Sequence, residues 1–327
     1  MNMFNKSDGF LLMEFHHSPG STVIFVSLLL IGYSITVLEN IVIVFIISKN
    51  KHLHTPMYFF LINLSILDIL VTTSITPKFL SILANGKGTI SYVGCMIQCY
   101  SYFLLGSTEI LILAVMSFDR FMAICYPLRY MAVLSPRVCL YLVSGSWVCA
   151  FVDTIAPTIL VAQLTFCGSN RINHFFCDVE QLLKLACRDT RYLNVLNFMV
   201  SAVIVFGSLI LIIVSYINII IAILKIPSSG GRWKSFTTCS SHLLVVFIFY
   251  AGNVFMSLRA IKNSVIDFNK VAIILNSIVT PLLNPFIYTL KNEQVKHAIK
   301  SVLSCEDNYV EKRPEEKEFQ HDHRIKH

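Results

Sequence analysis

Two carboxylic acids inside apolar stretches are the residues of this chain best placed to do chemistry. Asp68 and Glu109 each lie near the middle of a long apolar run, and Asn40 and Asn284 lie at compatible depths in two further runs. Carboxyl groups held away from water either take up a proton or hold a cation. We therefore expect either a sodium ion at Asp68 and Glu109 or a hydrogen-bonded polar core with neutral acids.

A pair of opposite charges ends the apolar run that contains Glu109. Asp119 and Arg120 are adjacent. A charge this far inside an apolar run costs a few kcal/mol unless it is paired with an opposite charge or reached by water. One interpretation makes Arg120 an anchor that reaches water at the membrane surface. The other makes Asp119 a restraint on Arg120 that a conformational change releases.

The elements that must position these residues are long apolar helices. The chain has 327 residues, of which 55% are hydrophobic and only 14% charged, whereas a soluble domain carries about a quarter charged residues. Runs longer than 20 residues without strand-like alternation predict membrane-spanning helices. We predict an all-α membrane protein, a seven-transmembrane helix bundle with a short amphipathic eighth helix. The expected spans are 23–47, 57–80, 94–126, 137–160, 192–224, 235–259 and 269–290.

The flanks of the bundle predict its orientation. An extracellular N-terminus at 1–22 and a receptor domain at 23–290 leave 16 Lys and Arg residues on the cytoplasmic side and 10 outside, which agrees with the positive-inside rule. No cleavable signal peptide is evident, so the first span is expected to act as its own insertion signal. The sequon at Asn5 fits an extracellular, glycosylated N-terminus. We expect a multi-pass protein of the plasma membrane with a cytoplasmic C-terminus.

The end of the chain divides into two parts. Residues 291–303 combine an apolar stripe with lysines on the opposite side, which predicts an amphipathic helix along the membrane. Residues 304–327 are highly charged and predict a disordered cytoplasmic tail. Cys305, between them, is either palmitoylated or a free cytosolic thiol.

The expected topology places four cysteines on the oxidising side. Cys95 begins the third span, and Cys167, Cys177 and Cys187 lie in the long loop before the fifth. Four cysteines allow three pairings. A Cys95–Cys177 bridge would hold the loop over the bundle and leave Cys167 and Cys187 to close the loop on itself, but spacing alone does not select this pattern.

Six sequence motifs occur in a fixed order along these spans. They are PMYFFL at 56–61, MSFDRFMAIC at 116–125 followed by PLRY at 127–130, HFFCD at 174–178, SY at 215–216, KSFTTCSSHL at 234–243 and PLLNPFIY at 281–288. In this order they resemble the olfactory receptors, within the rhodopsin-like G-protein-coupled receptors. The likeness covers roughly residues 5 to 303, and the first motif resembles the class II, tetrapod-type branch.

The resemblance implies a mechanism. An odorant binds in the upper bundle, and outward movement of the sixth span activates a stimulatory heterotrimeric G protein that raises cyclic AMP. The implied switch residues are Asp119, Arg120, Tyr216, His242, Pro285 and Tyr288. In the family, Asp68 and Glu109 lie in a region that resembles a sodium pocket favouring the inactive state. For His242 itself, a hydrogen-bonded structural role competes with a role as a proton sensor.

The chain departs from the family pattern at three places. Glu39 precedes Asn40 where the family usually has glycine, and Phe118 and Phe121 flank the Asp-Arg pair where tyrosines are usual. The tail after Ser304 is longer than usual. The first departure puts the neutrality of span one in doubt, and the second is expected to alter basal activity.

Helix periodicity predicts the side chains that face a ligand. Residues on one side of spans three, five, six and seven form aromatic and aliphatic walls with a few hydroxyls and amides. The alternative is ordinary interhelical packing, because small and polar residues also mediate helix contacts. The stripes in spans three, five and six carry no charge, so we expect a neutral volatile such as an alcohol, aldehyde, ketone or ester. The predicted residues are Tyr102, Phe103, Gly106, Ser107, Ile110, Asn197, Val200, Ser201, Ile204, Tyr250, Asn253, Val254, Ser257, Ile274 and Ser277.

Other functional classes have less support. The net charge of +7 is spread between apolar spans and matches no nucleic-acid-binding pattern. No metal-ligand spacing, phosphate-binding glycine loop or nucleophile motif predicts an enzyme or a cofactor other than the sodium ion. Two alternatives stay open: a transporter or proton-coupled carrier, because buried acids also mark ion pathways, and a receptor of the same superfamily for a metabolite that is not an odour.

Overall fold

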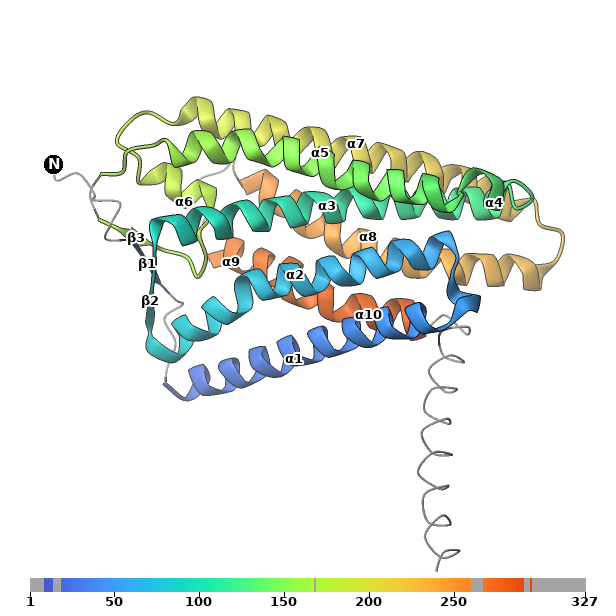
Figure 1. The fold of residues 1–327 in the computed structure, drawn as a ribbon, viewed down its shortest axis with the longest axis horizontal. Coiled ribbons are helices and arrows are strands. Elements are labelled where there is room, and N and C mark those ends of the chain that lie inside the picture. Colours follow the sequence, from blue (N-terminus) through green and yellow to red (C-terminus); the bar gives the residue numbers. More distant parts are fainter. Residues whose placement is uncertain (1–8, 14–18, 168, 260–266, 291–294, 296–327) are drawn as a thin grey trace, which may run out of the picture.

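The computed structural model describes residues 9–13, 19–167, 169–259, 267–290 and 295. Within these residues, six helices are long and apolar enough to cross a membrane. They lie side by side in one bundle (Figure 1). These helices are α1 (Pro19–Lys49), α2 (Pro56–Asn85), α3 (Tyr92–Cys125), α5 (Pro136–Ala162), α7 (Arg191–Leu224) and α8 (Ser229–Arg259).

The segment predicted as the seventh span is helical but interrupted. It consists of α9 (Asp267–Ile274), the π-helical turn η3 (Leu275–Val279) and α10 (Thr280–Leu290). Its longest apolar stretch, Leu275–Ile287, is shorter than the six helices above. A π-helical turn is rare and widens the helix locally.

Two prolines four residues apart explain why this segment needs partners from other helices. Pro281 and Pro285 lack an N–H, so the carbonyls of Ser277 and Pro281, four residues before each, lose their helical donors. The hydroxyl of Thr72 on α2 lies 3.1 Å from the Ser277 oxygen, and the amide nitrogen of Asn40 on α1 lies 3.4 Å from the Pro281 oxygen. Thr72 and Asn40 are fully buried, so they satisfy carbonyls that no water reaches.

One end of the bundle carries the disulfides Cys95–Cys177 and Cys167–Cys187 and is here called the disulfide end. It also carries a small sheet that was not predicted from the sequence. Strand β1 (Phe10–Met13) pairs antiparallel with β2 (Lys87–Ile90) and parallel with β3 (Arg171–Ile172), in the order β2-β1-β3. Phe10 and Leu12 point into the protein and are buried. The expected extracellular N-terminus therefore contains a strand that ties it to two loops.

The remaining short elements lie in the connections. The 3-10 turn η2 (Lys51–Leu53) joins α1 to α2, α4 (Tyr130–Val133) joins α3 to α5, and α6 (Val179–Lys184) lies in the long loop before α7. Residues at the helix starts explain where three of the long helices begin. Ser91, directly before α3, accepts a hydrogen bond from the backbone N–H of Gly94, and α2 and α5 each begin with proline.

The outer helices present apolar side chains to the surroundings. Large hydrophobic residues are exposed along α1, α5 and α7, while the buried residues form two clusters toward the two ends of the bundle. An apolar exterior of this extent is what a bilayer covers. Except for Val295, the amphipathic helix expected at 291–303 lies outside the described residues, as do Asn5, Cys305 and the rest of the tail.

Candidate functional site

A cavity of about 240 Å³ lies among α3, α7, α8 and η3, toward the disulfide end. This volume is below the roughly 300–1,000 Å³ of pockets that hold drug-sized ligands. Its wall is mostly apolar and aromatic, with several amides and carboxyls. The lining residues include Val71, Tyr102, Phe103, Gly106, Ser107, Glu109, Ile110, Asp178, Glu180, Asn194, Asn197, Phe198, Ser201, Ile204, Phe249, Asn253, Ile273 and Asn276.

Nine of the predicted ligand-binding residues lie on this wall. They come from three helices, so these faces of α3, α7 and α8 point toward one space, and binding of a ligand there stays a prediction. These nine are Tyr102, Phe103, Gly106, Ser107, Ile110, Asn197, Ser201, Ile204 and Asn253.

Four other predicted residues are not among the lining residues. Tyr250 donates a hydrogen bond to the hydroxyl of Ser208 on α7 at 2.6 Å, so it joins two helices below the wall. The Ser277 hydroxyl donates to the carbonyl of Ile273 in its own helix. Ile274 packs in the apolar cluster of the disulfide end, and Val200 is half-buried on α7. The side chains of Val254 and Ser257 lie outside the described residues.

Three acidic side chains on the wall were not among the predicted ligand-binding residues. Glu109 lines the cavity from α3, and Asp178 and Glu180 line it from the loop. The predicted stripes contain no acidic or basic side chain, whereas the wall as a whole contains three carboxyl groups. A neutral ligand stays a prediction. Asp178 could have been predicted as a wall residue, because it directly follows Cys177, which the predicted bridge to Cys95 would hold over the bundle.

Asp178 has an unusual environment for a loop carboxyl. Burial, and next the neighbouring carboxylate of Glu180, raise the pKa of Asp178 to about 7. The ammonium of Lys184 opposes this shift, and Lys184 is itself paired with Glu180, with Nζ and Oε1 2.7 Å apart. Asp178 therefore changes charge near neutral pH.

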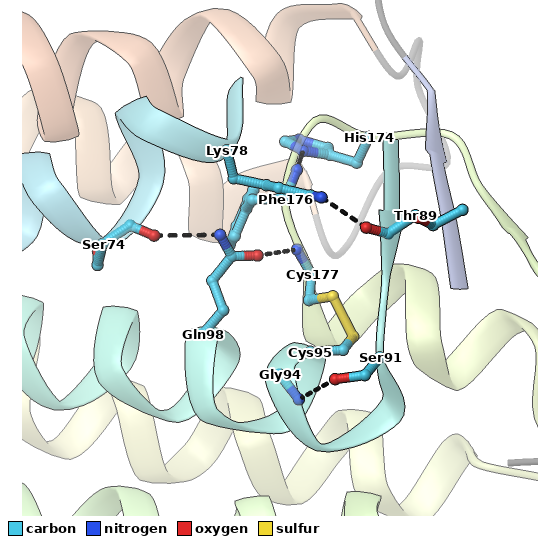
Figure 2. Close-up of a disulfide and its surroundings, with 10 residues drawn as sticks. All are labelled: Ser74, Lys78, Thr89, Ser91, Gly94, Cys95, Gln98, His174, Phe176 and Cys177. Carbon is cyan, nitrogen blue, oxygen red and sulfur yellow. Dashed lines mark hydrogen bonds between the residues drawn. A yellow bond between two sulfur atoms is a disulfide. The ribbon is translucent and has the colours of Figure 1, made fainter. Parts of the chain in front are cut away.

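Two disulfides hold the loop over the cavity. The structure pairs Cys95 with Cys177 and Cys167 with Cys187, which selects one of the three pairings that the sequence left open. Figure 2 shows that Gln98, one turn beyond Cys95, strengthens the first tether. Its side-chain oxygen accepts from the Cys177 N–H at 3.1 Å, and its side-chain nitrogen donates to the Ser74 carbonyl at 3.1 Å.

Three consecutive aromatic residues fill the space beneath this loop. Phe175 stacks on Phe79 of α2 with ring centroids 4.1 Å apart, and Phe176 lies 5.1 Å from the ring of Tyr102. His174 is fully buried, and burial followed by the charge of Lys270 lowers its pKa to about 3. Because Tyr102 lines the cavity, the loop forms part of the lid above it.

Of the two predicted buried acids, Glu109 lines the cavity from α3, and Asp68 on α2 lies next to α10. The side-chain nitrogen of Asn284 donates to both carboxylate oxygens of Asp68, at 3.0 and 3.1 Å. Glu109 Oε1, Asn40 Oδ1 and Asn284 Oδ1 are buried without a hydrogen-bond partner in the described structure. Oxygen atoms of carboxylates and amides are ligands for hard cations, so the chemistry of this donor set fits a sodium ion. Within the described residues, no group of three or more His, Cys, Asp or Glu forms a metal cluster.

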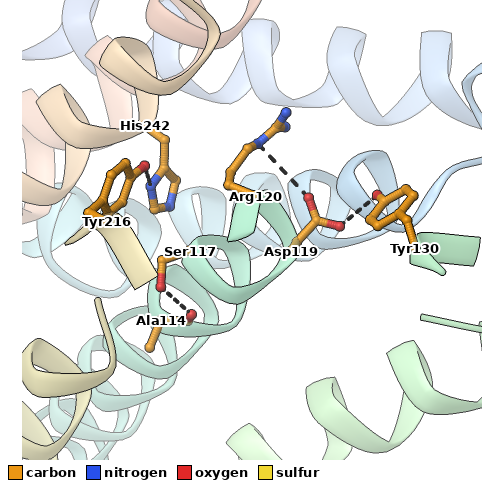
Figure 3. A network of polar contacts seen from close by, with 7 residues as sticks. All are labelled: Ala114, Ser117, Asp119, Arg120, Tyr130, Tyr216 and His242. Atoms are coloured by element: carbon orange, nitrogen blue, oxygen red, sulfur yellow. Dashed lines mark hydrogen bonds and ion pairs between the residues drawn. The ribbon is translucent and has the colours of Figure 1, made fainter. Parts of the chain in front are cut away.

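The predicted switch residues lie at the opposite end of α3. Asp119 Oδ2 is 3.9 Å from Arg120 Nε, while Asp119 Oδ1 accepts a hydrogen bond from Tyr130 of α4 at 2.7 Å (Figure 3). The contact of Tyr130 with this pair was not predicted from the sequence. Asp119 therefore has two competing partners, one on its own helix and one on the next connection.

A second polar pair joins α7 to α8 near Arg120. The hydroxyl of Tyr216 and Nδ1 of His242 are 2.7 Å apart, and their rings are stacked (Figure 3). His242 is fully buried and hydrogen-bonded, which is the arrangement expected for its structural role. Pro285 lies inside α10, and the side chain of Tyr288 lies outside the described residues.

Comparison with known proteins gives one consistent family. A family model described as olfactory receptor matches residues 29–306. The chain is 46% identical over 304 residues to Olfactory receptor 6J1 of Homo sapiens, covering 93% of this chain and 88% of the human protein. It is 46% identical over 304 residues to human Olfactory receptor 6F1, covering 91% and 98%, and 44% identical over 294 residues to Olfactory receptor 287 of Rattus norvegicus, covering 90% and 94%.

Proposed function

This chain belongs to the olfactory receptor family of G-protein-coupled receptors, and we propose that its odorant binds in the cavity under the disulfide-tethered loop. The observation that carries this proposal is the cavity of about 240 Å³, whose wall combines aromatic side chains with a few polar groups from α3, α7, α8 and the loop. Such a lining suits a small volatile molecule oriented by a few polar contacts. As a member of this family, the protein is a multi-pass receptor of the plasma membrane and not an enzyme.

The second part of the proposal concerns transmission to the cytoplasm. Helix α3 connects the two sites, because Tyr102 and Phe103 line the cavity and Asp119 and Arg120 end the same helix. An odorant that binds better to one arrangement of the bundle shifts the population toward it. Release of Arg120 from Asp119, together with separation of α8 from α7 at Tyr216 and His242, then opens a surface for a stimulatory G protein that raises cyclic AMP.

We further propose that residues 267–290 form the seventh membrane crossing. These 24 residues would span about 36 Å at 1.5 Å per helical residue, against a hydrocarbon core of about 30 Å. Their contacts support a path through the bundle: Lys270 donates to Asn173 in the loop at the disulfide end at 3.3 Å, and Asn284 reaches Asp68 inside α2. Seven crossings would put the two termini on opposite sides of the membrane. The disulfides at the end of the bundle that carries β1 favour an extracellular N-terminus, because disulfides form on the oxidising side, and hence a cytoplasmic C-terminus after the amphipathic helix proposed at 291–303.

Epitope tags test this topology. Antibodies on intact cells should reach a tag before residue 9 but reach a tag after residue 327 only once the membrane is permeabilised. A C-terminal tag exposed on intact cells contradicts the seventh crossing.

The buried acids support a sodium ion as a modulator of the inactive state. Asp68 and Glu109 would supply carboxylate oxygens, and Asn40 and Asn284 would supply amide oxygens that lack partners in the described structure. The ion would add positive charge between two carboxyls and so stabilise the packing of α2 against α3 and α10. Replacing sodium by N-methyl-D-glucamine should then lower the unfolding temperature of the purified receptor and should not change that of an Asp68→Asn variant.

A reporter of cyclic AMP in cells exposed to a broad panel of volatiles tests the function. We expect activation by part of the panel, and we expect Arg120→Ala to reach the cell surface without signalling. Arg129→Ala, which removes another arginine from the same end of the molecule, serves as the matched control. Full signalling by Arg120→Ala contradicts the role assigned to Arg120.

A further inference from the structure

We propose that an anionic phospholipid binds in a second cavity, at the end of the bundle opposite the disulfide end, with an acyl chain inside the cavity and its phosphate at a basic rim. This site goes beyond the proposed function, because it takes a lipid of the bilayer and not the odorant. It uses the proposed topology only to assign the lipid to the cytoplasmic leaflet.

The second cavity lies where the end of α1 and the start of α2 meet α4 and the start of α5, and its volume is about 440 Å³. This volume is within the range of roughly 300–1,000 Å³ that holds drug-sized ligands. Figure 1 shows α4 at the end of the bundle away from β1. Most of the lining side chains are apolar. The lining residues are Ile47, Ser48, Leu53, His54, Thr55, Pro56, Phe59, Ile62, Met131, Leu134, Pro136 and Cys139.

Contacts in the wall hold this cavity in place. Tyr130, the first residue of α4, donates a hydrogen bond to Asp119 of α3 at 2.7 Å. The thiol of Cys139 on α5 donates to the carbonyl of Leu134 at 3.6 Å. Leu53 and Leu134, which line the cavity from the two connections, are only 3% and 0% exposed. The cavity is therefore part of the packed fold and not a gap beside a loose loop.

The apolar surface of the cavity continues along α2 toward the middle of the membrane. Phe59 and Ile62 line the cavity, and Ile66 and Leu70 follow Ile62 at steps of four residues on the same face of the helix. Ile66 and Leu70 are 41% and 42% exposed, so hydrocarbon covers them in a bilayer. An acyl chain that lies along this face therefore reaches the cavity from the bilayer.

The rim of the cavity carries positive charge. Lys51 lies in η2 two residues before the lining residue Leu53, and Arg137 directly follows the lining residue Pro136; both cations are exposed. The connections at 50–55 and 126–135 contain no Asp or Glu. Basic residues at a membrane surface attract anionic headgroups. Cholesterol and diacylglycerol carry no charge, and phosphatidylcholine carries a cation beside its phosphate, so this rim favours an anionic phospholipid.

Polar side chains of the wall offer donors to the phosphate. Ser48, His54 and Thr55 line the cavity from the end of α1 and the connection to α2. Each hydroxyl or imidazole supplies an O–H or N–H donor, and phosphate oxygens are strong acceptors. Thr55 directly precedes α2 but makes no capping hydrogen bond with its side chain, so the helix does not use this hydroxyl.

A panel of lipids tests the ligand class on the purified receptor in detergent. Dioleoyl phosphatidylglycerol is compared with dioleoyl phosphatidylcholine, dioleoylglycerol, cholesterol and glycerol 3-phosphate at equal concentration. We expect phosphatidylglycerol to raise the unfolding temperature most, because in this panel it alone combines acyl chains with a net negative charge. An equal or larger shift with any other lipid overturns the anionic headgroup, and an equal shift with glycerol 3-phosphate overturns the acyl chain. Neither outcome affects the proposed odorant site.

A charge-removing double variant locates the phosphate. Lys51→Gln with Arg137→Gln should raise the phosphatidylglycerol concentration for half-maximal stabilisation by about tenfold or more, since each basic residue near a membrane surface strengthens the attraction to anionic lipid about fivefold. Lys225→Gln with Arg232→Gln is the matched control, because it removes the same charge from exposed positions between α7 and α8. The control should change this concentration much less. Equal weakening by both double variants means that only the overall charge attracts the lipid, and this overturns the site.

A bulky substitution tests the place of the acyl chain. Ser48 is exposed at the end of α1 and lines the cavity, so Ser48→Trp fills the space from the surface. This variant should lose the stabilisation by phosphatidylglycerol. Leu140→Trp is the control, because Leu140 is 54% exposed on α5 and is not among the lining residues, and it should keep the stabilisation. A full shift in Ser48→Trp overturns the placement of the chain in this cavity.

Discussion

At the scale of single residues, the interrupted seventh segment shows how a missing hydrogen-bond donor is compensated by side chains far away in the sequence. Pro281 and Pro285 free two carbonyls, and Thr72 and Asn40 reach them from α2 and α1. The proline spacing was visible in the sequence, and it predicts the two free carbonyls. The donors were not predictable, because they depend on which helices pack against the segment.

Removing one of these donors should destabilise the bundle. Thr72→Val keeps the shape of the side chain but leaves the Ser277 carbonyl without its donor. The Thr72 hydroxyl also lies 2.7 Å from the Asp68 carbonyl, so it shares its proton between two acceptors. We expect a loss of about 1–3 kcal/mol in the free energy of unfolding, measured as a lower unfolding temperature of the purified receptor.

The neighbouring threonine provides the control for this prediction. Thr73 is exposed, and its hydroxyl is 3.3 Å from that of Tyr33. Thr73→Val should change the unfolding temperature little. An effect of Thr72→Val no larger than that of Thr73→Val contradicts the role given to the Thr72 hydroxyl.

Asp178 should make stability depend on pH. Its pKa is about 7 in the folded protein against 3.8 for an ordinary aspartate, because burial and Glu180 disfavour its charge and Lys184 only partly offsets them. The stability that comes from its protonated form is fully present below pH 3.8 and is lost as the pH rises through 7. Asp178→Asn should therefore unfold at a higher temperature than wild type at pH 8, and the difference should shrink toward pH 5. A difference that grows toward pH 5 contradicts this assignment.

At the scale of elements, hydropathy predicted the six long helices, because length and apolar composition are local properties. The sheet at the disulfide end was not predicted, because β1 is only four residues long and pairs with β2 and β3, which lie far along the chain. The face of each helix was partly predictable. Spacing assigned Ser107 and Asn253 to the inward faces, and both line the cavity, whereas Tyr250 turns to Ser208, a neighbour that spacing alone does not reveal.

The two disulfides should differ in how much they stabilise these elements. Cys95–Cys177 closes a separation of 82 residues and Cys167–Cys187 one of 20. In the chain-entropy account the longer loop gives the larger stabilisation, by about 1 kcal/mol. The double variant Cys95→Ser with Cys177→Ser should therefore unfold at a lower temperature than Cys167→Ser with Cys187→Ser. The reverse order would show that the short bridge, and not the tether to α3, holds the loop.

At the scale of the whole molecule, the cavity and the switch occupy opposite parts of one helix. The sequence predicted both regions, because the charged pair is adjacent and the stripe of α3 is periodic. It did not predict the acidic loop residues on the cavity wall or the contact of Tyr130 with Asp119, since both depend on how connections fold back over the bundle. Signalling from the cavity to the switch requires that the contacts at Asp119 differ between two arrangements of the bundle.

Neutralising Asp119 should shift this equilibrium toward the active arrangement without any ligand. Asp119→Asn keeps an oxygen that accepts from Tyr130 but removes the charge that lies 3.9 Å from Arg120. A restraint of about 1 kcal/mol corresponds to a basal cyclic-AMP signal several-fold above wild type at equal surface expression. Asp189→Asn, which removes the exposed pair with Arg191 at the other end of the molecule, should leave the basal signal unchanged. If Asp119→Asn is as quiet as wild type but still responds to ligand, Asp119 does not restrain Arg120, and the resting state must be held by other contacts, such as Tyr216 with His242.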